Sequence, residues 1–556
     1  MLLFLSFSFT LAQDEVEKKI EKLGEIPKVA PDFEAKVRLP ELERTGVEIG
    51  KQRPLSLREV ITLALENSKD IEVFRQNVKS AEFDLKAAKG FFEPRFVGQS
   101  YFERSKTPNL TIFSSNQTIV NESIFSSLGL QSFLPKFGSV FTVNVSNQRL
   151  KTDNTFSILS PQENTNLSFS LTQPLLRGRR IDQARRSIEI AKKNLSLTDV
   201  QFRQKAIEVI TNVQKAYWDL TFALRNLQVQ IESVKDAKRQ LEHNRRLVEE
   251  GQLAPIDIVA TETQVANFEQ GVYDALNLVQ VTENALKILI AKEKGDPIWN
   301  ESIVPVDPVE VEVPKITLNE ALEIAFENRP EMELNEIQKQ INLIEKSFYE
   351  DQTKPQIDLT ASYTSAGIGG SQNPRFRPPF PLPCQTDPTS QACRQQLALL
   401  NSLTGSSLND IFANRYPTFR VGITVSLPLF GNQTQKALLG KALVEDDKIK
   451  SQRQQIEQVI QMDVRNALQL LRTAEARLRA AAIARENSEK QYESEQRKLD
   501  AGQSDIYRLL ERQTALTLAR SNELKAQIEL NKAIADLQKA MGSSLKANNV
   551  EARLRK

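Results

Sequence analysis

Few residues in this sequence could take part in catalysis or bind a metal ion. There is one histidine, His243, and there are two cysteines, Cys384 and Cys393, which share one proline-rich loop. His243 falls on a solvated part of a long predicted helix, so a histidine-based triad or a metal site lacks partners. No nucleophile–base set is visible elsewhere. The sequence therefore predicts no catalytic residues, no metal site and no cofactor.

Charged residues gather at the start of a predicted helix over 504–541: Asp505, Arg508, Glu511 and Arg512. Arg508 and Glu511 are three positions apart and share one helix face. The turn before this helix contains Gly502-Gln503, and a similar turn contains Gly251-Gln252. Glycine permits the left-handed backbone that a reversal between antiparallel helices requires. We call these two turns the helical tips.

Long amphipathic helices position these turns. Residues 178–249 contain no proline and carry apolar residues every seven positions, with one four-residue step that indicates a stutter in a coiled coil. Such a helix is roughly 108 Å long, too long for the core of a compact globule. A second helix of this kind is predicted over 432–499, with alanines at one seam position.

The chain is a tandem duplication. The segment Leu57–Asn67 recurs as Leu318–Asn328, shifted by 261 positions, and Ser56 and Thr317 are the predicted N-caps. We divide the chain into a signal peptide (1–12), a lead-in (13–53), a first repeat (54–293), a linker (294–315), a second repeat (316–541) and a C-terminal tail (542–556). The signal peptide lacks a basic start, and a buried N-terminal strand is the alternative.

Several segments alternate apolar and polar residues, as 419–429 does. This pattern and length suit a tilted strand of an outer-membrane barrel, although a half-buried soluble sheet is the alternative. Four such strands cannot close a barrel, so copies must associate. No run of 18 apolar residues predicts a membrane helix, and the net charge of +2 gives no reason to expect nucleic acid as a partner.

The order of these motifs resembles the TolC-like outer-membrane efflux protein family over about residues 54–541. The resemblance rests on the duplicated helix opening, the junction Leu171–Gly178 with its counterpart Val425–Gly431, and the two Gly-Gln tips. It implies an α+β, mostly α fold: a trimeric outer-membrane β-barrel of twelve strands, continuous with a periplasmic α-helical barrel. It also implies a passive exit duct for an efflux pump or a type I secretion system, without enzymatic activity.

The resemblance also implies partners: two further copies of the chain, outer-membrane lipid, a periplasmic adaptor and an inner-membrane pump. The adaptor is expected at the tips, at Gly251, Gln252, Gly502 and Gln503. The family has acidic, pore-facing residues at the two positions that correspond to Arg508 and Glu511. The family's basic residue that takes part in this link corresponds to Ser504, so that partner is absent here. Because Asp257 matches an acidic partner of the first repeat, an Asp257–Arg508 link is expected to hold the periplasmic gate closed. Solvated tip charges are the alternative.

Two further expectations concern loops. The loop 367–416 would face the cell exterior, an oxidising compartment that favours a disulfide between Cys384 and Cys393, with two free thiols as the alternative. A hairpin over 128–147 exceeds the family pattern, and we expect it to extend the barrel outward rather than widen its wall. A periplasmic coiled-coil adaptor or scaffold is the competing function.

Overall fold

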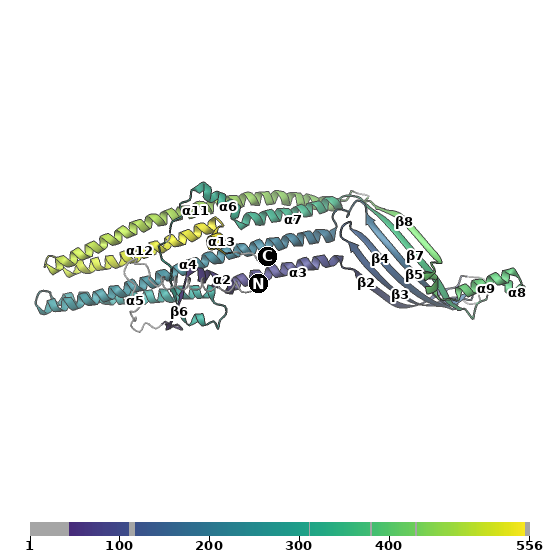
Figure 1. The fold of residues 1–556 in the computed structure, drawn as a ribbon, viewed down its shortest axis with the longest axis horizontal. Coiled ribbons are helices and arrows are strands. Elements are labelled where there is room, and N and C mark those ends of the chain that lie inside the picture. Colours follow the sequence, from purple (N-terminus) through teal and green to yellow (C-terminus); the bar gives the residue numbers. More distant parts are fainter. Residues whose placement is uncertain (1–43, 111–116, 311, 378–380, 429–430, 551–556) are drawn as a thin grey trace, which may run out of the picture. The chain divides into compact units, whose positions relative to one another are not determined.

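The computed structural model describes residues 44–110, 117–310, 312–377, 381–428 and 431–550. The predicted signal peptide and residues 13–43 of the lead-in lie outside these ranges. The chain divides into two compact units (Figure 1). The first, which we call the helical unit, comprises residues up to Ser80, Ser196–Ile337 and those from Ile449 onward; the second, the sheet unit, comprises Ala81–Leu195 and Gln338–Lys448. Each sequence repeat thus contributes to both units.

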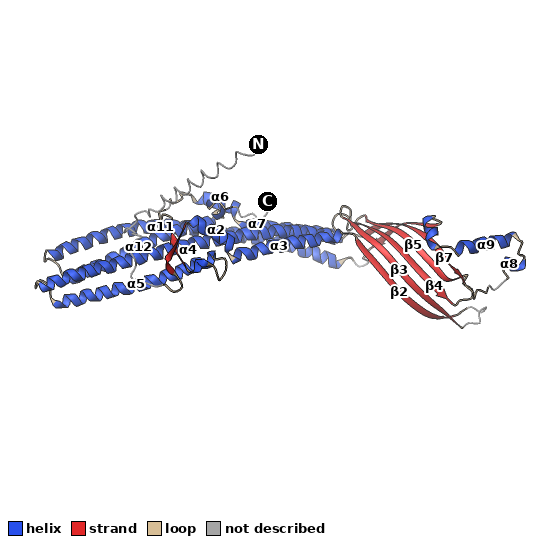
Figure 2. Cartoon of the chain, turned by 60° about the horizontal axis from the view of Figure 1, so that its bottom comes forward, coloured by secondary structure: helices blue, strands red, loops and turns tan. Residues whose placement is uncertain are grey.

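Two very long helices supply segments to both units. They are α4 (Gln183–Glu249) and α11 (Gln433–Asp500), each followed by a shorter helix, α5 (Pro255–Ile290) and α12 (Ile506–Ala540). The remaining helices of the two repeats are α2 (Leu57–Asn67), α3 (Lys69–Lys89), α6 (Leu318–Asn328) and α7 (Pro330–Gln352), and α13 (Ser544–Ala547) follows α12. Figure 2 shows this predominance of helix. The long helices predicted from the heptads are confirmed.

The duplication is visible in matching helix caps. The Ser56 and Thr317 side chains each accept a hydrogen bond from a backbone amide three residues later, and Glu59 and Glu320 complete the two capping boxes. In the first repeat the helix is interrupted at Ser68, which separates α2 from α3. In the second repeat the helix is interrupted at the equivalent residue, Arg329, which separates α6 from α7. Arg329 precedes a proline, which disfavours helical backbone.

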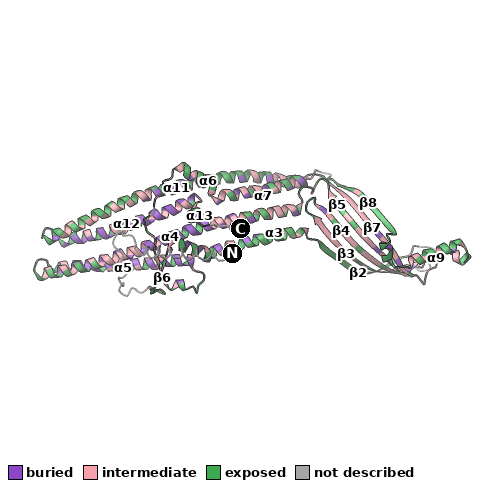
Figure 3. Cartoon of the chain, viewed as in Figure 1, coloured by how far each residue is buried: buried purple, intermediate pink, exposed green. Residues whose placement is uncertain are grey.

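The core of the helical unit is built on the predicted seam positions. Val464, Leu471 and Ala474 of α11 are buried in one cluster with Ala321 of α6 and Leu537 of α12. The corresponding seam of α4 is also buried, at Ala206, Val213, Leu220 and Ala223 among others. Figure 3 shows buried residues recurring along the helices, between exposed and intermediate ones. Small seam residues let neighbouring helices approach closely.

A pair of short parallel strands also belongs to the helical unit. β1 (Glu48–Leu55) pairs with β6 (Glu301–Pro305), and Arg53 lies opposite Ile303. The segment predicted as a plain linker, 294–315, therefore contains a strand. β1 begins within the predicted lead-in, so part of that segment is integrated into the fold.

The sheet unit contains one antiparallel sheet in the order β2-β3-β4-β5-β7-β8. Its strands are β2 (Arg95–Pro108), β3 (Thr118–Leu134), β4 (Ser139–Thr152), β5 (Leu159–Pro174), β7 (Gln356–Gln372) and β8 (Tyr416–Ser426). The first repeat supplies four of these strands and the second supplies two. Figure 1 shows the strands side by side.

The expectation that the 128–147 hairpin projects outward was wrong. β3 pairs with β2 from Arg95 to Pro108, and β4 pairs with β5, so both strands are integral to the sheet. The sequence motif marked only the half of each strand beside the turn. That turn lies against the start of the long helix: a Cβ on Gly138 would lie 2.8 Å from the Gly178 carbonyl oxygen, and its φ is +68°. Only glycine fits there without strain.

Candidate functional site

One face of the sheet carries uncharged polar side chains. Asn144 and Ser146 of β4 lie opposite Ser168 and Asn166 of β5, and Ser168 lies opposite Thr364 of β7. Residues paired across strands share a face, so hydroxyl and amide groups form a continuous surface over the three central strands. Such a surface hydrates easily and offers no strong charge to trap a passing solute. It is suited to line an aqueous passage.

The opposite face is apolar, as the alternation predicted. On β8, Phe419, Val421 and Ile423 point to this side and are exposed. An aromatic row crosses three strands here: Phe169 and Tyr363 have ring centroids 6.4 Å apart, and Tyr363 and Phe419 4.9 Å. Exposed apolar residues on one sheet face, with aromatics at its border, are typical of contact with lipid.

The long loop between β7 and β8 contains three helices, α8 (Pro383–Thr386), α9 (Gln391–Leu403) and α10 (Ser407–Phe412). Cys384 and Cys393 form a disulfide that joins α8 to α9. The structure therefore brings together the two cysteines of this loop, the pair expected for a loop in an oxidising compartment. Among the residues that the structure describes, no free cysteine remains.

Helix α10 lies directly on the apolar side of the sheet, beyond the aromatic row. Ser407 shares a hydrogen bond with Thr165 of β5 (2.7 Å), and Ser365 of β7 donates to the Ile411 carbonyl (3.1 Å). The close approach depends on glycine: a Cβ on Gly367 would lie 1.8 Å from the Ser407 carbonyl oxygen. Buried Asp410 forms an ion pair with Arg415 (2.9 Å). The two hydrogen bonds from α10 to β5 and β7 hold the loop on the sheet.

The two helical tips have the same backbone geometry. Gly251 and Gly502 have φ values of +73° and +69°. The Gln252 amide donates to the Leu247 carbonyl, and the Gln503 amide donates to the Lys498 carbonyl, both at 2.8 Å. These are Schellman-type endings of α4 and α11. The tips are exposed, and nothing within 4 Å surrounds either glycine's Cβ position.

The predicted gate residues lie just after the tips, but they do not contact one another in the ways expected. Asp257 accepts a hydrogen bond from the Ala254 amide (3.2 Å), and Arg508 pairs with Asp505 (3.3 Å). Within the described part of the chain, the structure gives no ion pair between Asp257 and Arg508. The Asp257 carboxylate instead caps the start of α5, and the Asp505 carboxylate caps the start of α12.

Glu511 borders a cleft between the first turns of α5 and α12. Ile256 and Val259 line it from α5, and Tyr507 lines it from α12. These three side chains are more than half exposed. Gln264 donates to Thr514 (2.9 Å) across the two helices. The charged residues of the tip region therefore lie beside an exposed apolar patch.

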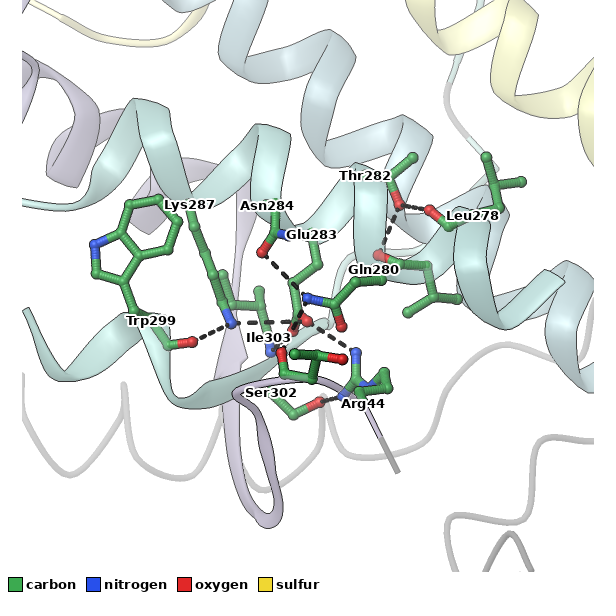
Figure 4. Close-up of polar contacts among 12 residues, drawn as sticks. Arg44, Leu278, Gln280, Thr282, Glu283, Asn284, Lys287, Trp299, Ser302 and Ile303 are labelled. Atoms are coloured by element: carbon green, nitrogen blue, oxygen red, sulfur yellow. Dashed lines mark hydrogen bonds and ion pairs between the residues drawn. The ribbon is translucent and has the colours of Figure 1, made fainter. Parts of the chain in front are cut away.

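A buried charge cluster, not anticipated from the sequence, joins Arg44, which precedes β1, to α5 and β6 (Figure 4). Glu283, fully buried, accepts from Arg44 (2.8 Å) and from the Ile303 amide (2.7 Å), and Lys287 lies 3.7 Å away. Lys287 also donates to the Trp299 carbonyl (3.0 Å). Burial lowers the pKa of the Lys287 ammonium from its ordinary value, and the Glu283 charge opposes this shift.

Two sequence signals could have revealed these missed features. The Gly367–Gly370 segment places three glycines within one strand, a sign of close backbone approach. Glu283 and Lys287 are an i,i+4 pair of opposite charge on an otherwise apolar helix face. Neither signal identifies its partners, because Ser407 and Arg44 are far away in sequence.

Within the described ranges, the structure shows no group of histidine, cysteine, aspartate and glutamate side chains arranged to hold a metal ion. No helix in those ranges has the length and apolar character needed to cross a membrane.

Comparison with known proteins gives a family and a fold. A family model described as "Outer membrane efflux protein" matches residues 60–292 and 329–543. Solved structures are similar over nearly their whole length. A Pseudomonas aeruginosa membrane protein is 16% identical with a TM-score of 0.61, covering 91% of this chain and 97% of its own. The Campylobacter jejuni outer membrane channel CmeC is 15% identical (TM-score 0.59; 95% and 98% covered).

The open-state MtrE outer membrane channel of Neisseria gonorrhoeae is 16% identical, with a TM-score of 0.57, covering 93% of this chain and 98% of its own. No curated protein matches the sequence. At these identities the structural matches support the fold alone, and the family match rests on both sequence repeats.

Proposed function

Since this chain belongs to the outer membrane efflux protein family, and is an outer-membrane exit duct that extends into the periplasm, we propose that three copies form one conduit. The observation that carries this proposal is the two-sided sheet. Its neutral polar face suits a water-filled passage, and its apolar face suits lipid. Family members work with a periplasmic adaptor and an inner-membrane pump, which supplies the energy. The duct itself needs no catalytic residue.

We further propose that the adaptor binds at the helical tips. Gln252 and Gln503 are exposed and follow equivalent turns, so the two repeats present similar surfaces. The glycines beside them have positive φ, and any other residue there strains the backbone. A glycine substitution would thus mix strain with loss of contact, and the glutamines give the cleaner test.

Replacing both Gln252 and Gln503 with tryptophan should reduce export by at least about tenfold, the effect of losing about 1.4 kcal/mol of binding energy. The bulky rings should block docking but leave the helix endings intact. The variant is produced in cells from which the gene for the native duct has been deleted. Export by these cells and the amount of trimer in their outer membrane are then measured. Gln469→Trp, at an exposed position within α11, is the matched control. Loss of trimers in the double variant would show that these positions are structural.

We also propose that the periplasmic end closes through links between copies. Asp257 and Arg508 lie just after the two tips, and within one chain each makes an exposed local contact. The exposed residues Ile256, Val259 and Tyr507 offer an apolar surface beside them that neighbouring copies would cover. In this arrangement Arg508 of one copy pairs with Asp257 of the next, and Glu511 faces the aperture.

Charge reversal at the proposed link should open the conduit. Arg508→Asp is expected to raise the conductance of purified trimers in planar bilayers, because like charges would then face each other. The added Asp257→Arg change should lower the conductance again. Arg512→Asp is the control, since Arg512 donates to Gln491 of α11 instead. If Arg508→Asp and Arg512→Asp leave conductance equally unchanged, the gate lies elsewhere.

A further inference from the structure

The six-stranded sheet ends in two unpaired edges. β2 and β8 are the first and last strands, and all but one residue of each is exposed. Phe96 of β2 and Phe419 of β8 are each 77% exposed. Within the described residues, each of these strands has a partner on one side only. Each therefore presents a row of backbone amide and carbonyl groups to whatever lies beside it.

An open edge of this kind is not tolerated in a lipid bilayer. The hydrocarbon core offers no hydrogen-bond partner, so every strand in it must be paired on both sides. Six strands are too few to close on themselves, because the smallest membrane barrels have about eight. Since the described residues contain no further strand for this sheet, a second copy of the chain is the partner that fits each edge.

We infer that β8 of one copy pairs with β2 of the next, so that each copy contributes six strands to one closed wall. The six strands alternate in direction, so β2 and β8 run antiparallel to each other. Head-to-tail association of identical copies then gives an antiparallel junction. The polar faces also match, since Glu103 of β2 and Arg420 of β8 lie on the same side of the sheet with opposite charges.

This inference rests on the proposed homotrimer for its strand count. Three copies of a six-stranded sheet give an eighteen-stranded wall, where the family resemblance had implied twelve. For strands about 4.8 Å apart and tilted by about 40°, the backbone radius is roughly 18 Å for eighteen strands and roughly 12 Å for twelve. The cross-section within the wall is therefore about twice as large.

The larger lumen changes where cargo is restricted. Its lining, over β4, β5 and β7, consists mainly of neutral hydroxyl and amide groups. A wall of this radius leaves an aqueous channel, as in porins of comparable strand number. The sheet unit would therefore discriminate only weakly between polar cargoes of different size or charge. The residues that follow the helical tips are then the place where passage is controlled.

Cysteine pairs test the edge junction. Val421→Cys on β8 is combined in turn with a cysteine at Phe96, Gly98, Ser100 or Phe102 of β2, all on the apolar side, in the full-length chain in membranes. One combination should give covalently linked dimers and trimers after mild oxidation. Val421→Cys with Val145→Cys of the central strand β4 is the control and should give none. The native disulfide occupies both natural cysteines. Absence of cross-links in all four combinations overturns the junction.

Electron cryomicroscopy of the purified assembly tests the strand count. Eighteen strands are expected. Twelve strands, whether from a dimer or from a trimer with the β3–β4 hairpin outside the wall, would overturn the inference. Export by the wild-type chain is measured in parallel. A twelve-stranded wall in an exporting protein refutes only this inference, and an eighteen-stranded assembly that fails to export refutes only the proposed function.

Discussion

Replacing Glu283 with alanine is expected to lower the free energy of unfolding by about 3–5 kcal/mol, the largest effect of any single change proposed for this chain. Glu283 is fully buried and accepts hydrogen bonds from Arg44 and from the Ile303 amide. Its removal leaves Arg44 and Lys287 as buried cations without a counter-ion and detaches β6 from α5. Thermal unfolding of the purified protein, together with its yield in membranes, measures the loss.

The chain provides a matched control for this prediction. Glu262 pairs with Arg245 at the same 2.8 Å distance, but both side chains are about half exposed. Glu262→Ala should therefore cost less than about 1 kcal/mol. A second variant with Arg44→Met, Glu283→Leu and Lys287→Met should recover much of the stability, because apolar side chains can replace a buried ionic cluster. Equal effects of Glu283→Ala and Glu262→Ala would contradict the prediction.

Replacing Gly367 with alanine is expected to detach α10 from the sheet. The new methyl group would overlap the Ser407 carbonyl oxygen, which belongs to the backbone and cannot move alone. Detachment breaks the Thr165–Ser407 and Ser365–Ile411 hydrogen bonds, worth about 1 kcal/mol each. The detached population should then rise roughly 30-fold. Trypsin cleavage after Arg415 in intact cells should accelerate in proportion, because proteolysis follows the open population.

Gly422→Ala is the control for this change, because it adds the same methyl group to the adjacent strand β8. The nearest atom to its Cβ position is the Thr360 hydroxyl oxygen at 3.7 Å, an ordinary contact. Cleavage should stay at the wild-type rate. If Gly367→Ala is cut no faster than Gly422→Ala, α10 is not held by the contacts that the structure shows.

Local signals in the sequence predicted much of this fold. A capping box depends on residues three positions apart, so Ser56 with Glu59 and Thr317 with Glu320 were recognisable without any tertiary information. The heptad seam was equally local, and Val464 and Leu471 are buried as the pattern required. The reversal at Gly251 and Gly502 follows from the conformational freedom of glycine.

Features that depend on distant partners were not predictable in the same way. The hairpin pattern gave the turn near Gly138 but not the pairing of β3 with β2, which decides whether the hairpin extends the wall. Glu283 meets Arg44 across more than 200 residues, and Ser407 meets Thr165 across a similar separation. The Asp257–Arg508 link was inferred from the family alone. Within one chain both residues have local partners, so the link stays a prediction about the assembly.

The β3–β4 hairpin also bears on how such walls can change size during evolution. A hairpin inserts two strands of opposite direction, so the strands on either side keep their orientation and the two sheet edges remain complementary. One inserted strand would instead make β2 and β8 run in the same direction, and a ring of identical copies would lose its antiparallel order. Gain or loss of a whole hairpin is thus the smallest genetic change that still lets the wall close. Each such change alters the strand number of the wall by two for every copy in the ring.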